Sequence, residues 1–477
     1  MEISPADLQR PGGVLLPQYV MLPEGPRPDW AIVVEASRFA DVGPAAEVIA
    51  RHPGRHPLEL PGVLIMPGFI DAHHHLTQSF GKSLAFGEPS EIFRRIWVPL
   101  EGSLDDRLVY LTAKLAALES LRGGFTTVCD AGTRAKGSID ALAAATRDAG
   151  LRCVLGLLCN DRGATGETAD PAPIIARAEQ HLAGFEHQPL VHPSLAVSIP
   201  EAASDAMLGR VSALCAEAGA VFQTHVNEHL ASVERSVVAR GLRPLEVLAR
   251  AAALGPQALV AHATLVTPSE LALLRDTGTA VSYNPVASQW KGNAVAPALL
   301  MASLGIRFGL GTDATRSDGF RLMDAAESAQ KLAFGLSVGD ASSGAGWTWL
   351  DHATRAGADA AGLESVTGQI RAGCEADFLL VDLDVPEMHP SFDLTWELVR
   401  LGNRDQILAV CVGGRLRLWR GWPVDWDGRA LLKEVAATAA AAVANAPIQK
   451  IHPASSEHRR ATIAASDGGR SVPAPRR

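Results

Sequence analysis

The sequence predicts an α/β protein, a (β/α)8 barrel of the TIM type with a small β-sandwich domain that is built from both termini. Three observations indicate this architecture. Short apolar runs alternate with amphipathic helical segments over residues 67–367, eight such runs can be counted, and strand-like segments flank them on both sides. A doubly wound open sheet is the alternative, but no GxGxxG motif follows a strand.

The barrel is expected to consist of eight strands separated by helices. In chain order the strands are residues 63–75, 124–132, 151–159, 190–198, 220–225, 257–263, 279–284 and 306–313. Between the first two strands, the segment RLVYLTAKLAALESLRGG repeats leucine at three- and four-residue spacing, and two glycines end the pattern. This spacing is typical of an amphipathic helix with one apolar face.

The flanking segments predict a second domain. Residues 1–66 contain short β-like runs such as WAIVVEA, and residues 368–430 contain ADFLLVDLD and QILAVCVGGRLRLW. We expect these two regions to pair as the two parts of one sandwich. Residues 431–477 begin with an alanine-rich helix and continue into a polar tail, for which the composition predicts disorder.

Composition narrows the class of protein. Hydrophobic residues make up 47% of the 477 residues, which is enough for a large core, and the net charge of −9 argues against a nucleic-acid partner. No run of 18 apolar residues and no basic segment followed by an apolar one is found, so we expect neither a membrane protein nor a secreted one. Six cysteines without a CxxC pair fit a cytoplasmic location.

The motif PGFIDAHHH, residues 67–75, places three histidines at the end of an expected barrel strand. Side chains alternate faces along a strand, so His73 and His75 point the same way and His74 points opposite. Two imidazoles on one face suit two positions around one metal ion, and the carboxyl ends of barrel strands carry the active site. A lone HxH pair could equally be a structural feature.

Three further strand ends carry residues that are suited to the same site. His225 lies in QTHVNEH, His262 in VAHAT and Asp313 in GLGTDAT. Because the carboxyl ends of all barrel strands meet at one mouth, these side chains are expected to converge with the first histidines.

Together with GQIRAGCEADFLLVDLD, these motifs resemble the amidohydrolase superfamily over nearly the whole chain apart from the tail. The resemblance is strongest to the aminohydrolase branch, which includes guanine, 8-oxoguanine, pterin and cytosine deaminases and the triazine hydrolases. It implies that His73, His75 and His225 are imidazole ligands and that Asp313 is the carboxylate near the metal. Zinc is the default divalent ion, and iron is the alternative.

The sequence also bears on the number of metal ions. Many binuclear relatives bridge two ions with a carboxylated lysine at the end of a mid-barrel strand. The expected third and fourth strands contain no lysine, and the nearest ones, Lys136 and Lys291, fall outside them. We therefore expect one metal ion per chain.

The resemblance also implies catalytic roles. The ion supplies a hydroxide near neutral pH, and Asp313 accepts the proton of the water. Glu228, three residues after His225, protonates a ring nitrogen and later relays a proton to departing ammonia. His262 holds the attacking oxygen by a hydrogen bond. By itself, Glu228 could be a solvated charge beside His229.

Besides Glu228, three residues are expected to contact the substrate. Guanine and 8-oxoguanine deaminases have a glutamine at the place that matches Gln78, where it contacts the heterocycle. A side-chain amide both donates and accepts hydrogen bonds, which suits a carbonyl group beside a ring N–H, and a cap at the strand end is the alternative role. Guanine deaminases supply an arginine from the end of the fourth strand, which this chain lacks, and Arg162 after the third strand is the candidate substitute. Trp290 offers a flat face to a heteroaromatic ring, and Asn284 and Lys291 shape the pocket around it.

The predicted function is hydrolytic deamination of an amino-substituted nitrogen heterocycle of the purine, pterin or triazine type, with release of ammonia. The enzyme class is a hydrolase that acts on C–N bonds other than peptide bonds. The alternatives are a triazine-type hydrolase that displaces chloride or an alkylamine, a cyclic-amide hydrolase, and a non-catalytic scaffold. The resemblance also implies a homo-oligomer, in the first instance a dimer, with a small heterocyclic substrate as its other partner.

Overall fold

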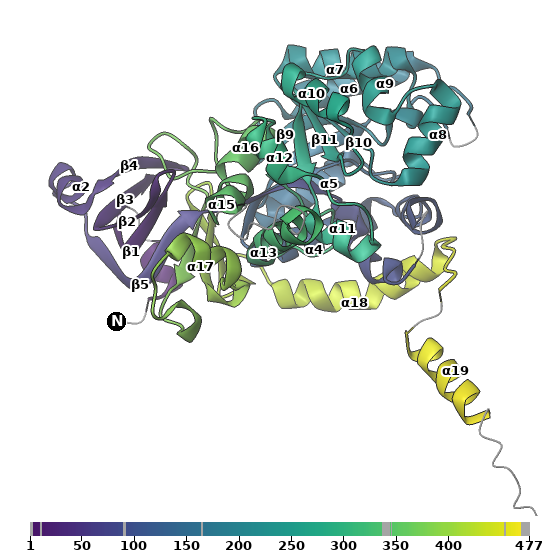
Figure 1. The fold of residues 1–477 in the computed structure, drawn as a ribbon. Coiled ribbons are helices and arrows are strands. Elements are labelled where there is room, and N and C mark those ends of the chain that lie inside the picture. The colour runs from purple at the N-terminus through teal and green to yellow at the C-terminus, as the bar shows by residue number, and fades with distance from the viewer. Residues whose placement is uncertain are drawn as a thin grey trace, which may run out of the picture.

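The structure of the protein is a computed structural model that describes residues 3–9, 12–88, 92–163, 166–335, 344, 346–452 and 455–468. A barrel with outer helices lies beside a second β-sheet that contains both early and late parts of the chain (Figure 1).

Eight strands form the barrel, and each one pairs in parallel with its neighbour in chain order, from β6 to β13. At the closing edge, the backbone N–H of Asp313 donates to the carbonyl of His73 at 2.8 Å. The predicted (β/α)8 barrel is confirmed. The strands are β6 Phe69–His74, β7 Phe125–Asp130, β8 Arg152–Leu158, β9 Val191–Val197, β10 Val221–Val226, β11 Ala258–His262, β12 Ala280–Tyr283 and β13 Phe308–Leu310.

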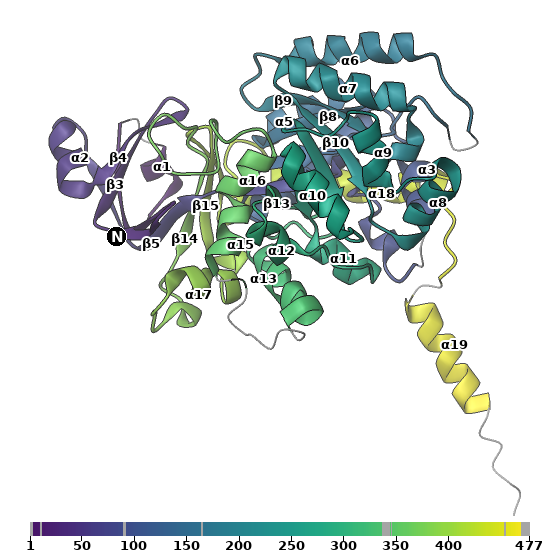
Figure 2. The same cartoon turned by 45° about the horizontal axis from the view of Figure 1, so that its top comes forward.

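Helices surround the barrel (Figure 2). Helix α4, Asp106–Arg122, coincides with the leucine pattern: it buries Leu111, Leu118 and Leu121, and Asp105 caps it by accepting from the N–H of Leu108. The other helices of the barrel region are α3 Val98–Glu101, α5 Ile139–Ala149, α6 Pro171–Phe185, α7 Asp205–Ala218, α8 Leu230–Arg240, α9 Pro244–Arg250, α10 Pro268–Thr277, α11 Pro285–Lys291, α12 Ala298–Ser303, α13 Gly319–Gln330, α15 Gly346–Ala353 and α16 Arg355–Ala360.

The amino-terminal end of the barrel is filled by apolar side chains. Ala358 and Ala360 of α16 pack in one cluster with residues from the starts of the strands, including Ile70, Val154 and Leu259. This packing leaves the carboxyl end of the barrel as the end that can hold a site.

The second domain is a mixed sheet of nine strands in the order β17-β16-β15-β14-β5-β1-β3-β4, with β2 paired to β1. The two ends of the chain meet where β14 runs antiparallel to β5, with Leu380 opposite Ile65. The predicted domain from both termini is confirmed, and its strands join in one continuous sheet. Its elements are α1 Pro5–Leu8, β1 Val14–Leu22, β2 Gly25–Pro28, β3 Trp30–Glu35, β4 Arg38–Pro44, α2 Ala45–Arg51, β5 Pro57–Pro67, β14 Phe378–Asp382, β15 Ile407–Val412, β16 Arg415–Trp419 and β17 Trp422–Pro423.

The single strand predicted for residues 63–75 is wrong, because this run is divided between the two sheets. Strand β5 of the mixed sheet ends at Pro67, and β6 of the barrel begins at Phe69. Gly68 lies between them, where a Cβ would come within 2.2 Å of the Thr126 side chain. The absence of a side chain at Gly68 therefore lets the chain pass closely from one sheet into the other.

Helix α17, Leu394–Arg400, lies in the chain between β14 and β15 and packs on α13 and α15. After the mixed sheet the chain returns to the barrel, where α18, Gly428–Asn445, packs on α4 and runs along the barrel (Figure 1). Helix α19, Ser455–Gly468, lies within the segment for which the sequence predicted disorder. The expectation for residues 453, 454 and 469–477 lies outside the described residues. No helix in the described part of the chain is long and apolar enough to cross a membrane.

Candidate metal and catalytic site

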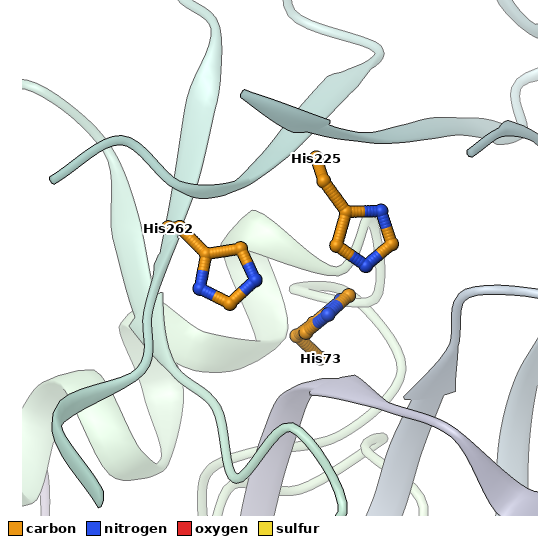
Figure 3. Close-up of side chains that lie close together, drawn as sticks. All are labelled: His73, His225 and His262. Atoms are coloured by element: carbon orange, nitrogen blue, oxygen red, sulfur yellow. The ribbon is translucent and has the colours of Figure 1, made fainter. Parts of the chain in front are cut away.

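Three histidines from three strands turn toward one another at the carboxyl end of the barrel (Figure 3). His73 lies near the end of β6, His225 lies on β10, and His262 is the last residue of β11. The ring centroids of His73 and His225 are 4.7 Å apart, and those of His73 and His262 are 5.4 Å apart. One ring nitrogen from each of the three lies within 4.8 Å of the others.

His75 and Asp313 complete the cluster. His75 directly follows β6 and precedes the short 3-10 helix η1, Leu76–Gln78. The Nε2 atom of His75 is 3.2 Å from Nε2 of His225 and 3.4 Å from Oδ1 of Asp313. The same carboxylate oxygen is 3.5 Å from Nε2 of His73. The four residues predicted as ligands thus lie together in the structure.

His74, between the two clustered histidines, has different surroundings. Its Nε2 atom lies 3.4 Å from the hydroxyl of Ser317, as the alternation of side chains along a strand predicts. Burial lowers the pKa of His74 to about 3. The ring is therefore neutral at ordinary pH, and we assign it a structural role.

The buried ring nitrogens of the cluster fit a metal ion. Nε2 of His73 is buried without a hydrogen-bond partner among the described residues. Nδ1 of His225 lies 2.6 Å from the carbonyl of Ser198, so Nδ1 carries the proton and the lone pair of Nε2 is available. Burial and neighbouring imidazoles lower the pKa of His75 and His225, which keeps both in the neutral form that binds metals.

His262 presents an N–H group rather than a lone pair. The amide oxygen of Asn284 accepts from the Ser282 hydroxyl at 2.8 Å, so the amide nitrogen faces Nδ1 of His262 at 3.2 Å. Nδ1 accepts this bond, and the ring proton is then on Nε2, 3.6 Å from Oε2 of Glu228. Burial lowers the pKa of His262 to about 3, so the ring is neutral. This arrangement suits a hydrogen-bond donor.

Two carboxylates and one ammonium group lie beside the histidines. Nζ of Lys291 is 2.8 Å from Oε1 of Glu228 and 2.6 Å from Oδ2 of Asp313. Burial raises the pKa of both carboxyls, but Lys291 and the nearby histidines outweigh it and hold both pKa values well below the usual range. Burial likewise lowers the pKa of Lys291, and the two carboxylates more than reverse this. All three groups are charged at neutral pH.

Two cavities open next to this cluster and share Gln78, Lys291 and Asp313 in their walls. The first also includes Glu228, and the second includes Trp290, whose ring packs edge-on against Phe86 at 5.0 Å. The amide of Gln78 donates to the buried carboxylate of Glu101 at 3.3 Å, which orients it. Gln78 and Trp290 therefore lie where a bound ring could contact them.

Arg162, the other expected substrate contact, lines neither of these two cavities. Its backbone forms a bridge with Thr168, and its N–H donates to the carbonyl of Ala202 at 3.0 Å. These contacts hold the segment beside the loop that follows the fourth barrel strand. The prediction that Arg162 binds the substrate is not supported by this placement.

Two buried carboxyl groups that the sequence analysis did not single out hold the site together. Asp71 accepts hydrogen bonds from the backbone N–H and the hydroxyl of Thr312, directly before Asp313. Asp130 accepts from the N–H of Leu76 at 2.8 Å, directly after His75. Their signal in the sequence was an acidic residue within an otherwise apolar strand, in FIDAHH and TTVCD.

Comparison with known proteins identifies relatives over most of the chain. Residues 64–417 match the model of the amidohydrolase family. A 5-methylthioadenosine/S-adenosylhomocysteine deaminase of Nitratidesulfovibrio vulgaris strain DP4 is 30% identical over 421 residues, which cover 85% of this chain and 91% of the relative. A protein of the same name from Aquifex aeolicus is 28% identical and covers 84% and 91% of the two chains.

Solved structures agree with this assignment. An adenosine deaminase from Xanthomonas campestris with bound zinc superposes with a TM-score of 0.83 at 25% identity, covering 91% of this chain and 99% of the other. An atrazine chlorohydrolase from Arthrobacter aurescens TC1, complexed with zinc, shares the fold with a TM-score of 0.75 at 20% identity, covering 90% and 100%. Since the family model spans well over half of its length, this chain belongs to the amidohydrolase family.

Proposed function

We propose that the protein is a metal-dependent hydrolytic deaminase of an amino-substituted nitrogen heterocycle. The observation that carries this proposal is the placement of Glu228, Asp313 and the Nε2–H of His262 next to a donor set that fits a metal ion. Family membership and the deaminases among the relatives support a hydrolase that acts on C–N bonds other than peptide bonds.

Adenine-type purines and their nucleosides are the first candidates among the possible heterocycles. The support comes from the names of the relatives, which are deaminases of methylthioadenosine, S-adenosylhomocysteine and adenosine. The two cavities that meet at Gln78 and Asp313 could take a ring and a substituent on that ring. Pterins and aminotriazines are the further candidates and are tested beside them.

His73, His75, His225 and Asp313 would hold the metal ion, and zinc is the first choice because the similar structures contain it. A bound divalent ion would lower the pKa of a water molecule from 15.7 to about 7 and so supply a nucleophile near neutral pH. We propose one ion per chain. A carboxylated Lys291 would be an anion beside two carboxylates, so this lysine does not suit a bridge between two ions.

The side chains of the protein would manage the protons of the reaction. Both carboxylates are ionised before the reaction begins. Asp313 is placed to accept the first proton of the attacking water, and Glu228, with an oxygen within 4.8 Å of it, to pass that proton on to the ring nitrogen next to the amino-bearing carbon. A C–O bond then forms, and the Nε2–H of His262 donates a hydrogen bond to the new oxygen. The C–N bond breaks as the second proton of the water reaches the amine, which leaves as ammonia. Such acid–base assistance contributes roughly 10²–10⁴-fold.

The test is ammonia release from adenine nucleosides, free bases, pterins and aminotriazines by zinc-loaded protein. We expect Glu228→Gln to lower kcat at least about 10²-fold and to keep its metal. Glu234→Gln is the matched control, because Glu234 is exposed on α8 and does not line either cavity. No ammonia from any compound, or full turnover by Glu228→Gln, would contradict the proposal.

Elemental analysis tests the metal content separately from activity. We expect one tightly bound ion per chain in the wild type and loss of that ion in a His73→Ala/His225→Ala variant. Two tightly bound ions per chain would show that the proposed single-metal site is wrong.

A triazine-type hydrolase that displaces chloride or an alkylamine is the second candidate. The shared fold of the atrazine chlorohydrolase structure favours testing it. Glu228 favours deamination, because an amine leaves poorly without a proton and chloride needs none. Faster release of chloride from a chlorotriazine than of ammonia from any aminoheterocycle would favour this alternative.

A homodimer and a cytoplasmic location also stay proposals that rest on the family resemblance and the cysteine content. Light scattering on the purified protein at several concentrations tests the first of them.

A further inference from the structure

Lys291 connects the two carboxylates of the site. Its ammonium group contacts one oxygen of each, Oε1 of Glu228 at 2.8 Å and Oδ2 of Asp313 at 2.6 Å. The second oxygen of Asp313 faces the histidine cluster, 3.4 Å from His75. The second oxygen of Glu228 faces Nε2 of His262 at 3.6 Å. Each carboxylate therefore has one oxygen directed toward the site and the other bound to the same lysine.

The local backbone places the lysine there. Lys291 is the last residue of α11, and Gly292 ends the helix in the left-handed conformation with φ of +67°. Asn293, directly beyond this turn, adds a longer contact of 3.4 Å to Oε1 of Glu228. The side chain of Lys291 is 19% exposed and lines both cavities.

The charges explain why a cation is needed at this position. A carboxylate oxygen of Glu228 and one of Asp313 lie within 4.8 Å of each other in a buried site. Two ionised carboxylates at that separation repel each other, and low exposure to water strengthens the repulsion. An ammonium group hydrogen-bonded to both removes the repulsion and fixes their separation.

We propose that Lys291 is a positioning residue for the deamination, which holds Glu228 and Asp313 at the separation at which they exchange protons with the substrate and the attacking water. This inference rests on the proposed function. Its consequence is that loss of Lys291 slows the chemical step more than it weakens substrate binding.

The kinetic test compares Lys291→Met with Lys291→Arg. We expect Lys291→Met to lower kcat about 10²-fold with less than about a fivefold change in KM, because the proton-transfer geometry is lost. Lys291→Arg keeps the charge and should recover a large part of kcat. Lys433→Met, at an exposed position on α18, is the matched control and should behave as wild type. Equal kcat for Lys291→Met and wild type would overturn the inference.

A double variant distinguishes positioning from an unrelated structural effect. If Lys291 acts through the carboxylate of Glu228, the Glu228→Gln/Lys291→Met variant should have nearly the same kcat as Glu228→Gln alone. If the fold reductions in kcat of the two single variants multiply in the double variant, the lysine does not act through Glu228 and the inference is overturned.

A labelling experiment is independent of activity. Acetylation of lysines by an N-hydroxysuccinimide ester, followed by mass spectrometry, should modify Lys291 slowly in the wild type and faster in Glu228→Gln. Lys433 should react at the same rate in both proteins. If the wild type releases no ammonia, the proposed function fails. The labelling experiment still tests whether Lys291 is bound to the carboxylate of Glu228. Equal rates at Lys291 in the two proteins overturn the inference whatever the activity.

Discussion

The buried carboxyl of Asp71 lies where the barrel closes, between the first strand, β6, and the last, β13. It accepts from the N–H of His73 at 3.2 Å and from the N–H and hydroxyl of Thr312 at 2.9 and 2.5 Å. Asp71 thus links the strand that carries the histidines to the loop that carries Asp313. Replacing it with asparagine keeps the shape of the side chain and removes the titrating group.

The structure sets the size of the effect. Burial raises the pKa of Asp71 from 3.8 to about 7, although the three hydrogen bonds act to lower it. Between pH 3.8 and about 7, Asp71 therefore keeps its proton in the folded protein and loses it in the unfolded chain. The protonated Asp71 therefore adds to the free energy of unfolding. This contribution is fully present below pH 3.8 and is lost as the pH rises toward 7. The full difference of about three pKa units corresponds to about 4 kcal/mol.

The assay is urea unfolding of metal-stripped protein at pH 5 and pH 7.5, followed by tryptophan fluorescence. The measured quantity is the free energy of unfolding of Asp71→Asn minus that of the wild type. We expect this difference to increase by about 3 kcal/mol from pH 5 to pH 7.5, which corresponds to about two pKa units. Glu364→Gln, at an exposed position, is the control and should show a constant difference. A constant difference for Asp71→Asn as well would mean that Asp71 is ionised in the folded protein and would refute the reasoning.

Three further predictions concern other parts of the molecule. Arg152→Met should destabilise the protein by about 3–5 kcal/mol in urea unfolding, because it leaves the carboxylate of Asp377 buried without its partner at 2.8 Å. Trp290→Ala should raise KM by up to about tenfold with little change in kcat, as measured by steady-state kinetics, because a stacking face is lost. Truncation after Asn445 removes the backbone N–H groups that contact Glu88 and should speed hydrogen exchange in residues 92–97.

Local patterns in the sequence determined the barrel and the positions of the candidate ligands. Leucines at helical spacing predicted α4, and apolar runs predicted the eight barrel strands, although the first run also included the end of β5. Alternation along a strand separated His73 and His75 from His74, and the structure surrounds His74 with different groups. These features were predictable because they depend on the period of one strand or helix, and because all the carboxyl ends of a parallel barrel lie on one side.

Only the tertiary structure decided the features that depend on contacts between distant segments. The division of the run 63–75 at Gly68 follows from the proximity of Thr126, and the placement of Arg162 follows from pairing with Thr168 and Ala202. The same holds for the bridge from Lys291 to Glu228, 63 residues earlier in the chain. No local pattern encodes such distances, because they are set when helices and strands pack into one core.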